Sequence, residues 1–285
     1  MPESAKEMEI TSPEEQMLKP VRSSAGDDMH ILVTNDDGVN APGLLALVGA
    51  LRPLGKVSVL APDKNWSASG HVKTLHRPLR VKEVELADGS LALASDGAPS
   101  DCVALALLGL LAEPVDLVVS GINPNANVGH DVTYSGTVTA AMEAVICGVP
   151  GVAISLDSPE NHKGQLDYRA AAQTARLVVE ILIAHDLSKQ ALLNVNVPYL
   201  LFEQISGMRV TRQGLRLYRD SLVRRLDPRG RPYYWIGGEA PTGVVEPGTD
   251  FGALAEGAVS ITPLHLDLTD EVNREIFAAW DWDKR

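Results

Sequence analysis

The stretch that decides the fold joins an apolar run to a polar, acidic turn: Ile31-Leu32-Val33-Thr34-Asn35-Asp36-Asp37-Gly38-Val39-Asn40. Its apolar, partly β-branched start predicts a buried strand of a parallel sheet. Two neighbouring carboxylates, Asp36 and Asp37, follow at the C-terminal end of that strand. In open α/β sheets ligands bind in the crevice beyond the carboxyl ends of the strands, so this pair marks a candidate binding site.

The chemistry of the acidic pair leaves three interpretations. Adjacent carboxylates repel each other unless a cation or a shared proton neutralises them, which favours a hard divalent metal held by oxygen ligands. A surface turn is the ordinary alternative, because Asn, Asp and Gly are turn formers. A phosphatase with a covalent Asp-x-Asp nucleophile does not fit, because Gly38 stands two residues after Asp36 and Asn35 two residues before Asp37.

Further oxygen donors follow two other predicted strands. The loop Asp63–Thr74 comes after the strand Val57–Leu60 and contains Ser67 and His71. Asn123 follows the strand Val115–Val119 and brings an amide oxygen to the same edge. A set of oxygen ligands suits Mg²⁺, Mn²⁺ or Ca²⁺ better than zinc. Taken singly, these residues also have an ordinary interpretation as parts of solvated polar loops.

An apolar helix is predicted to begin at Gly136, after Tyr134 and Ser135. Free backbone N–H groups at a helix start attract anions, Gly136 permits close approach, and the hydroxyls of Ser135 and Thr137 add donors. Ordinary N-capping by Ser135 is the alternative, and both roles are compatible. A phosphate group is the anion expected to bind at this helix start beside a hard cation.

Short apolar strands alternate with helical patterns along most of the chain, which predicts βαβ units and a parallel sheet. The predicted strands are His30–Thr34, Val57–Leu60, Leu91–Ala94, Val115–Val119, Gly151–Ser155, Ala191–Val195 and Val259–Thr262. The predicted helices are Leu44–Leu51, Pro99–Leu111, Gly136–Cys147, Tyr168–Ile183 and Asp270–Ala279.

The two ends of the chain differ from this pattern. Residues 1–28 hold seven acidic and three basic residues without sustained periodicity, so we expect an acidic, disordered tail. Residues 29–285 are expected to form a single α/β domain. Within it, residues 208–236 alternate around the turn Asp227-Pro228-Arg229-Gly230 and predict a projecting β-hairpin.

Bulk composition excludes several classes of protein. The formal charge of −12 over 285 residues argues against general nucleic-acid binding. No apolar run reaches membrane-spanning length, and the N-terminus lacks the basic start and apolar middle of a secretory signal. Cys102 and Cys147 lie in apolar, helix-like stretches and are expected to be reduced core thiols, so we expect a cytoplasmic protein.

These motifs, in this order, resemble those of the SurE family of stationary-phase survival nucleotidases. The stretches that carry the resemblance are Ile31–Gly38, Ala61-Pro62-Asp63 with Ser67 and Gly70-His71, Gly97–Val103, Ser120–Asn123, Tyr134–Val138 and Ser260–Leu264. The resemblance runs from about His30 to the last helix. With the strand and helix pattern, it implies an α/β fold with a Rossmann-like, three-layer parallel-sheet core, a C-terminal extended β-hairpin and a closing helix.

The resemblance also implies a function. The family contains metal-dependent phosphatases that act on nucleoside 5′- and 3′-monophosphates, with one divalent cation, Mg²⁺ or Mn²⁺, expected per subunit. Its metal ligands match Asp36, Asp37, Ser67 and Asn123, and its phosphate-facing helix start matches Ser135, Gly136 and Thr137. Asp36 and Asp37 are the candidate catalytic residues, and Asn35, His71 and Asn127 are further candidates for substrate contact.

The hairpin corresponds to the element that the family uses for subunit exchange, which implies a homodimer or homotetramer. Eight arginines between Met208 and Pro232 also raise the alternative of an RNA-binding surface, but the acidic body favours subunit pairing. A nucleotide or metal sensor that binds without turnover is a second rival. Metal-dependent release of phosphate separates an enzyme from such a sensor.

Overall fold

The computed structural model describes residues 29–185 and 191–283. The predicted tail, residues 1–28, lies outside this part. The strands of the main sheet are β1 His30–Thr34, β2 Lys56–Pro62, β3 Val81–Glu85, β4 Leu91–Ser95, β5 Leu117–Asn123, β6 Gly151–Asp157, β7 Leu192–Pro198, β8 Met208–Val210 and β11 Val259–Leu264. The hairpin strands are β9 Arg216–Leu226 and β10 Pro232–Gly243.

The helices follow the predicted order, with one addition. They are α2 Pro42–Leu51, α3 Pro99–Leu105, α4 Gly136–Ile146, α5 Arg169–Ala184, α6 Asp250–Ala255 and α7 Glu271–Ala278. A π-helical turn, Ala106–Leu110, continues α3 and explains why a single longer helix was predicted there. None of these helices, in the part of the chain that the structure describes, is long and apolar enough to cross a membrane.

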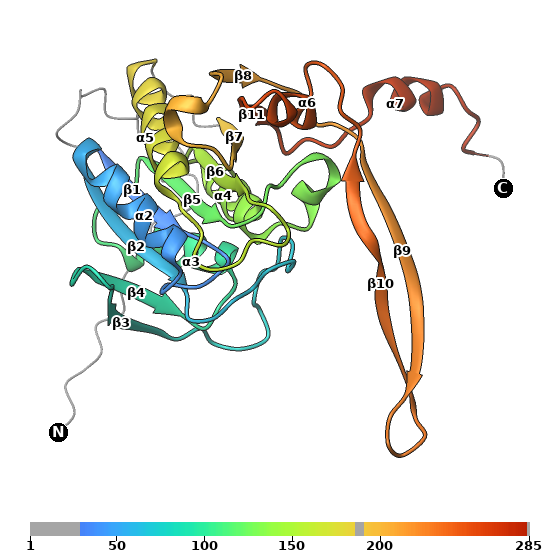
Figure 1. The fold of residues 1–285 in the computed structure, drawn as a ribbon, viewed down its shortest axis with the longest axis horizontal. Coiled ribbons are helices and arrows are strands. Elements are labelled where there is room, and N and C mark those ends of the chain that lie inside the picture. The colour runs from blue at the N-terminus through green and yellow to red at the C-terminus, as the bar shows by residue number, and fades with distance from the viewer. Residues whose placement is uncertain (1–28, 186–190, 284–285) are drawn as a thin grey trace.

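The nine-stranded sheet has the order β3-β4-β2-β1-β5-β6-β7-β11-β8. Its strands are mostly parallel, with antiparallel pairs between β3 and β4 and between β11 and β7. Helices α2 and α5 cover one face and α3 and α4 the other (Figure 1). The predicted α/β fold with a three-layer, Rossmann-like core is therefore confirmed.

Strand β1 shows how the sequence produces these layers. Successive side chains of a strand point to opposite faces. Ile31 and Val33 accordingly pack in the core that includes Leu44 of α2, whereas Leu32 packs with Val103 of α3. All three side chains of this run are fully buried, as expected for a strand covered on both faces.

The strand order places a topological switch point beside β1. From β1 the chain passes to β2 and then β4 on one side, and returns to β5 on the other side. At such a point the loops leaving the two neighbouring strands turn in opposite directions and open a crevice at the carboxyl edge. Asp36 follows β1 and Asn123 ends β5, so both lie at this crevice.

Strand β5 runs farther than predicted. It continues to Asn123 because its pairing with β6 shifts register between Ser120 and Asn123, which inserts an extra residue on β5. A Cβ atom at Gly121 would lie 2.4 Å from the carbonyl oxygen of Ile154, so glycine fits at this position and a larger residue does not. The Ser-Gly pair resembles a loop in sequence, but it forms a bulged strand end.

The predicted hairpin boundaries, 208–236, are wrong. Met208–Val210 pairs with β11 in the main sheet, and the hairpin proper consists of β9 and β10, from Arg216 to Gly243. The predicted turn is correct, because Gly230 N donates to Asp227 O at 2.9 Å. The pairing continues past Ile236, where the predicted strand ended, and through the glycines that follow it as far as Gly243.

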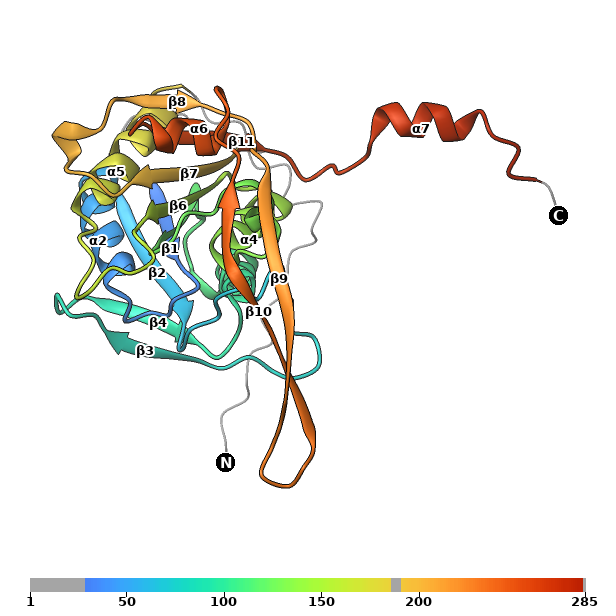
Figure 2. The same cartoon turned by 45° about the vertical axis from the view of Figure 1, so that its right-hand side comes forward.

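The last helix does not close the fold. None of the residues of α7 is buried, and the helix extends away from the sheet (Figures 1 and 2). The closing helix that the family resemblance implied over Asp270–Ala279 is therefore present as a helix but does not pack against the body. The sequence also gave no strong signal for two short elements, β8 and α6, or for the largely exposed edge strand β3.

Candidate active site

Asp36 and Asp37 lie at the tip of β1, as predicted. Asp36 is buried and Asp37 half-buried. The hydroxyl of Thr137 donates to Asp36 Oδ1 at 2.5 Å, and the amide of Asn65 donates to Asp37 Oδ1 at 3.2 Å. The backbone of the following loop also reaches the pair, because Trp66 N donates to Asp36 O at 2.7 Å. Thr137 and Asn65 belong to α4 and to the loop after β2, so three segments meet at these carboxylates.

Asn35 shapes the turn that presents the pair. Its side-chain amide donates to Gly38 O at 3.0 Å, and its Oδ1 accepts from Gly38 N at 3.2 Å. Gly38 has φ of +103°, and a Cβ atom there would lie 3.3 Å from the backbone carbon of Lys64. Both polar groups of Asn35 are thus used inside the turn, although the sequence had suggested substrate contact.

In the absence of a cation, the surroundings of Asp36 and Asp37 disfavour the ionised forms of both carboxyl groups. Burial raises the pKa of Asp36, while hydrogen bonds from Thr137 and from the start of α4 partly offset this effect. Burial, together with the negative charge of Asp36, raises the pKa of Asp37 to about 7. A nearby cation would restore the charge of both groups, so the pair has the electrostatic character of a cation site.

The start of α4 lies directly against Asp36. A Cβ atom at Gly136 would lie 2.7 Å from Asp36 Cβ and 3.0 Å from Asp36 Oδ2, so this position requires glycine. Ser135 caps the helix, with its hydroxyl accepting from Val138 N at 3.1 Å. The structure thus brings the predicted phosphate-facing residues to the carboxylate pair, with the Thr137 hydroxyl bonded to Asp36.

Ser67 and His71 belong to the same loop but lie in different surroundings. Ser67 is exposed, one residue after Trp66, and its backbone N donates to Asn65 Oδ1 at 2.8 Å. His71 Nε2 lies 2.9 Å from Glu143 Oε2. Glu143 is seven residues beyond Gly136, about 10 Å along the helix axis. The contact between His71 and Glu143 therefore lies about 10 Å along α4 from the helix start that contacts Asp36.

The two asparagines after β5 also have different surroundings. Asn123 is half-buried at the strand end, and its amide nitrogen donates to Asn125 O at 2.5 Å, which leaves Oδ1 as its potential ligand atom. Asn127 is buried, and its amide donates to Ser155 Oγ at 2.7 Å. Its backbone carbonyl accepts from Asn194 and Asn196 at 2.7 and 3.1 Å. Asn127 thus fastens the loop to β6 and β7.

Tyr168 is a site residue that the sequence did not indicate. It precedes α5, and its ring packs beside Gly43 at the start of α2. Burial and the negative charge of Asp37 raise the pKa of Tyr168 to about 12, so the phenol stays neutral near the carboxylate pair. In the sequence Tyr168 appeared only as the first residue of the predicted helix Tyr168–Ile183, and no local pattern connected it with the acidic pair.

The donor set suits a hard cation. Among residues 29–185 and 191–283, no group of three or more His, Cys, Asp or Glu side chains could hold a metal ion. The candidate ligands here are two carboxylates supplemented by the neutral oxygens of Ser67 and Asn123. Such an oxygen set fits Mg²⁺ or Mn²⁺ and disfavours zinc.

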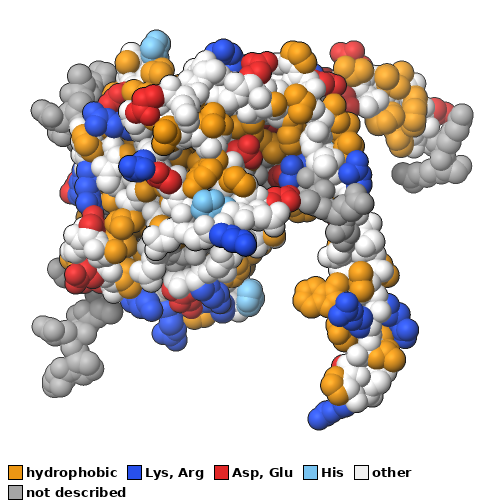
Figure 3. Space-filling view, in the orientation of Figure 1, with side chains coloured by type: hydrophobic (Ala, Val, Ile, Leu, Met, Phe, Trp, Pro, Cys, Tyr) orange, Lys and Arg blue, Asp and Glu red, His pale blue; other side chains and the backbone are white. Residues whose placement is uncertain are grey.

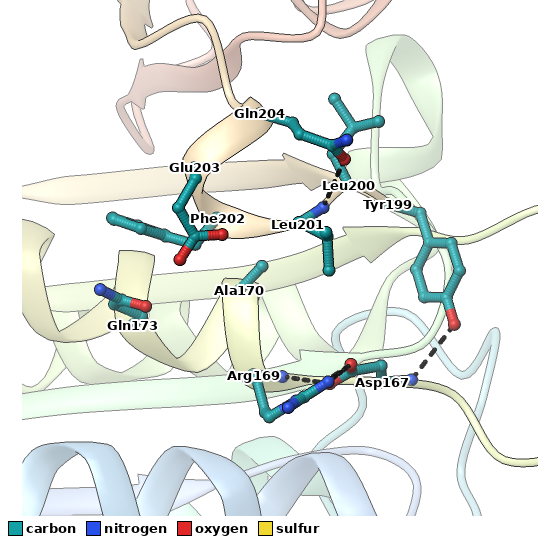
Figure 4. A pocket seen from close by; sticks show the side chains of 10 residues that line it. All are labelled: Asp167, Arg169, Ala170, Gln173, Tyr199, Leu200, Leu201, Phe202, Glu203 and Gln204. Carbon is teal, nitrogen blue, oxygen red and sulfur yellow. Dashed lines mark hydrogen bonds and ion pairs between the residues drawn. The ribbon is translucent and has the colours of Figure 1, made fainter.

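A separate cavity of about 440 Å³ lies between the start of α5 and the segment after β7 (Figure 4). Its lining residues are Asp167, Arg169, Ala170, Gln173, Tyr199, Leu200, Leu201, Phe202, Glu203 and Gln204. The Arg169 guanidinium points to Asp167 at 2.6 Å, and Tyr199 accepts from Asp167 N at 3.3 Å. These contacts pair the Arg169 charge internally, and none of the predicted site residues lines the cavity.

The fold, together with the residues at the carboxyl edge of the main sheet, defines a Rossmann-like α/β protein with a candidate cation site at the topological switch point. The model of the family "Survival protein SurE" matches residues 31–220. Two similar curated proteins are each called 5′-nucleotidase SurE. The one from Herpetosiphon aurantiacus is 55% identical over 89% of this chain and 99% of its own length, and that from Chloroflexus aggregans is 52% identical over 90% and 100%.

A solved structure agrees with these sequence matches. The SurE protein from Aquifex aeolicus superposes with a TM-score of 0.74 at 39% identity, covering 88% of this chain and all of that one. The chain described here belongs to the SurE family. The resemblance noted from its sequence motifs is thereby confirmed.

Proposed function

We propose that this chain hydrolyses nucleoside 5′-monophosphates, and 3′-monophosphates, to nucleoside and phosphate with one bound divalent cation per subunit. The observation that carries the proposal is the pair Asp36 and Asp37 at the switch point, with Asp36 bonded to Thr137 at 2.5 Å. The activity is the one named for the curated relatives. Mg²⁺ or Mn²⁺ is the cation that this oxygen set favours.

Asp36, Asp37, Ser67 and Asn123 are the residues that would hold the cation. A divalent cation at this position supplies Lewis-acid chemistry, by lowering the pKa of a water molecule and polarising a phosphoryl oxygen. Thr137 and the start of α4 fix the orientation of Asp36. Asp37 receives one side-chain hydrogen bond, from Asn65, and is the freer of the two to orient the attacking water or accept its proton.

The start of α4 would bind the phosphate group. Helix α4 has eleven residues, and its first N–H groups lie at the same edge as the carboxylate pair. Such groups stabilise negative charge on the equatorial phosphoryl oxygens, and a Gly at the first position permits close approach. Ser135, on one side of Gly136, adds a hydroxyl that accepts from Val138 N and can donate its own proton to phosphate, whereas the hydroxyl of Thr137 donates to Asp36. This local polarity offsets the net negative charge of the protein for an anionic substrate.

The test is phosphate release from AMP and GMP with Mn²⁺ or Mg²⁺. Wild-type protein should release phosphate with the metal and stop when EDTA is added. Asp36→Asn should lose at least about 100-fold in kcat/KM, because it removes a charged ligand. Glu83→Gln, an exposed carboxylate on β3, should leave the rate unchanged. Full activity in Asp36→Asn, or binding of AMP without turnover in the wild type, would contradict the proposal.

We also propose that the hairpin mediates formation of a homodimer or homotetramer. Several of its large apolar side chains are exposed, among them Leu222, Trp235 and Ile236. The space-filling view shows apolar and basic side chains next to each other on the hairpin (Figure 3). Exposed apolar patches of this kind mark association surfaces.

A cytoplasmic location is supported by the thiols of Cys102 and Cys147, which are both free.

A further inference from the structure

Glu143 is a buried carboxylate that the proposed reaction does not use. It lies on α4, and its side chain is only 3% exposed. One oxygen, Oε2, is 2.9 Å from His71 Nε2, and the other, Oε1, accepts from Lys73 Nζ at 2.9 Å. Both partners belong to the loop that carries Ser67. Glu143 therefore binds this loop from inside the protein, through both of its oxygens.

The electrostatics of Glu143 depend on these two loop residues. Burial acts to raise the pKa of Glu143, but the hydrogen bonds from His71 and Lys73 outweigh it and lower the pKa below its ordinary value. An ionised carboxylate inside a protein needs such partners, because an unpaired buried charge is strongly unfavourable. The contact therefore stabilises a particular loop position as well as the charge.

Other contacts fasten the same part of the loop. The hydroxyl of Thr139, one turn before Glu143 on α4, donates to Gly70 O at 3.1 Å. Thr74 donates twice to the buried Asp101 of α3, from N at 2.8 Å and from Oγ1 at 2.6 Å. The segment from Gly70 to Thr74 is thus fixed to both helices on this face of the sheet.

The opposite end of the loop is fixed to the acidic pair. Trp66 N donates to Asp36 O at 2.7 Å, and Asn65 donates to Asp37 Oδ1 at 3.2 Å. Ser67 lies between this end of the loop and the fixed segment from Gly70 to Thr74, and it is itself exposed. Helix α4 contacts both ends, through Thr137 to Asp36 and through Glu143 to His71. A single rigid helix thus sets the distance between Asp36 and the distal part of the loop.

We propose that Glu143 is a positioning residue that holds the loop 67–74 against α4, through His71 and Lys73, and so keeps Ser67 beside Asp36 and Asp37. This inference rests on the proposed function, in which Ser67 is a metal ligand. It assigns His71 to loop placement rather than to substrate contact. Glu143 touches neither substrate nor metal in this role.

The test measures binding of Mn²⁺ alone by isothermal titration calorimetry, beside kcat and KM for AMP at saturating Mn²⁺. Glu143→Gln should weaken Mn²⁺ binding about 10-fold or more, as is typical when a partner of a ligand-bearing group is removed. At saturating Mn²⁺ its kcat should recover to within about twofold of wild type. A general loss of folded protein would instead lower kcat and leave the affinity of the folded fraction unchanged.

A second variant removes the same contact from the loop side and leaves Glu143 unchanged. His71→Asn combined with Lys73→Met changes only loop residues whose side chains are 31% and 50% exposed, and should weaken Mn²⁺ binding to a similar extent. The matched control is Glu180→Gln, which breaks the Arg176–Glu180 ion pair on α5 and should bind Mn²⁺ as wild type does.

The outcomes separate the two proposals. Wild-type Mn²⁺ affinity in the loop double variant, or in a folded Glu143→Gln protein, would overturn the positioning role while the metal site stands. Wild-type Mn²⁺ affinity in Asp36→Asn would overturn the metal site itself, and the positioning role with it.

Discussion

Thr137 orients the central carboxylate of the site from a fully buried position. Its hydroxyl donates to Asp36 Oδ1, and the same hydrogen bond helps to offset the rise that burial causes in the pKa of Asp36. Since buried hydrogen bonds to charged groups are strong and costly to lose, this hydroxyl favours the ionised form of Asp36 and fixes its orientation. The role follows from the contact and does not require Thr137 to touch phosphate.

Thr137→Val tests this role, because valine keeps the shape and removes the hydroxyl. The variant should bind Mn²⁺ about 10-fold to 100-fold more weakly and lose about 1–3 kcal/mol of stability. Thr137→Ser keeps the donor and should stay close to wild type in both respects. Calorimetric Mn²⁺ titration and urea unfolding provide the measurements. Equal Mn²⁺ affinities for the Val and Ser variants would refute the role of the hydroxyl.

Gly136 offers a second test at the same scale, through the space that it leaves empty. In Gly136→Ala the new methyl group would meet Asp36 at 2.7 Å, so the helix start or the carboxylate must move. We expect a loss of kcat/KM of at least about 10-fold, since displacements near 1 Å are costly at a reacting centre. Gly49→Ala on α2, which has open space, should be neutral or stabilising by up to about 1 kcal/mol. Normal AMP hydrolysis by Gly136→Ala would show that the close approach is not needed.

The residues that sequence reasoning placed well are those whose position in a strand or helix decides their surroundings. Asp36, Asp37 and Asn123 stand at strand ends, and Ser135–Thr137 stand at a helix start, so topology alone brings them to one edge. The surroundings of Asn35, His71 and Asn127 depend instead on individual partners. Glu143 is 72 residues from His71, and Ser155 is 28 from Asn127, and no local pattern specifies such pairs.

At the scale of elements, the loop after β2 and helix α4 are joined by a contact that depends on pH. The groups facing Glu143 are His71 and Lys73 from the loop and Cys147 from the C-terminal end of α4. Because the pKa of Glu143 is lowered in the folded protein, its contribution to stability is complete above the ordinary pKa of about 4.5. That contribution is lost as the pH falls through the lower, folded-state pKa.

Urea unfolding of wild type and Glu143→Gln across pH tests this coupling. The difference in unfolding free energy should be constant from pH 7 to about pH 5 and shrink below about pH 4.5, where the carboxylate of the unfolded chain takes up its proton. Glu180→Gln, on the exposed side of α5, should show a much smaller difference throughout, because surface ion pairs contribute little. A difference that grows as the pH falls would have the wrong sign for this account.

The hairpin base is joined to the site by a second contact between elements. The short helix Gly129–Thr133 precedes α4, and within it Asp131 accepts from Tyr218 Oη at 2.6 Å and pairs with Arg216 at 3.1 Å. The sequence pattern located the hairpin but not the short helix, and the hairpin boundaries were wrong because the pairing of β9 with β10 continues to Gly243. The pairing of β9 with β10 therefore also decides which hairpin residues contact the short helix before α4.

At the scale of the whole molecule, the acidic body and the arginine-rich hairpin form two distinct surfaces. Within residues 29–185 and 191–283, the hairpin strands pair with each other and with no strand of the main sheet. They project from that sheet, as both ribbon views show (Figures 1 and 2). A two-stranded hairpin is only marginally stable by itself, so one of this length is expected to gain stability from a partner. Its exposed aliphatic side chains, such as Leu222 and Ile236, favour a second protein surface over a nucleic acid, since they would gain little from contact with phosphates.

Paired substitutions in the hairpin decide whether that partner is another copy of the chain. Leu222 and Ile236 face each other in the β9–β10 register and are 71% and 83% exposed. Changing both to Lys adds two charges to a surface that already carries several arginines, so association through the hairpin should be disrupted. Light scattering after gel filtration should then show an assembly smaller than that of the wild type, counted in units of 30.5 kDa. Ile181→Lys on α5, which is 52% exposed, is the control and should leave the mass unchanged. If the hairpin variant keeps the wild-type mass, association must use another surface, and the exposed α7 becomes the element to test.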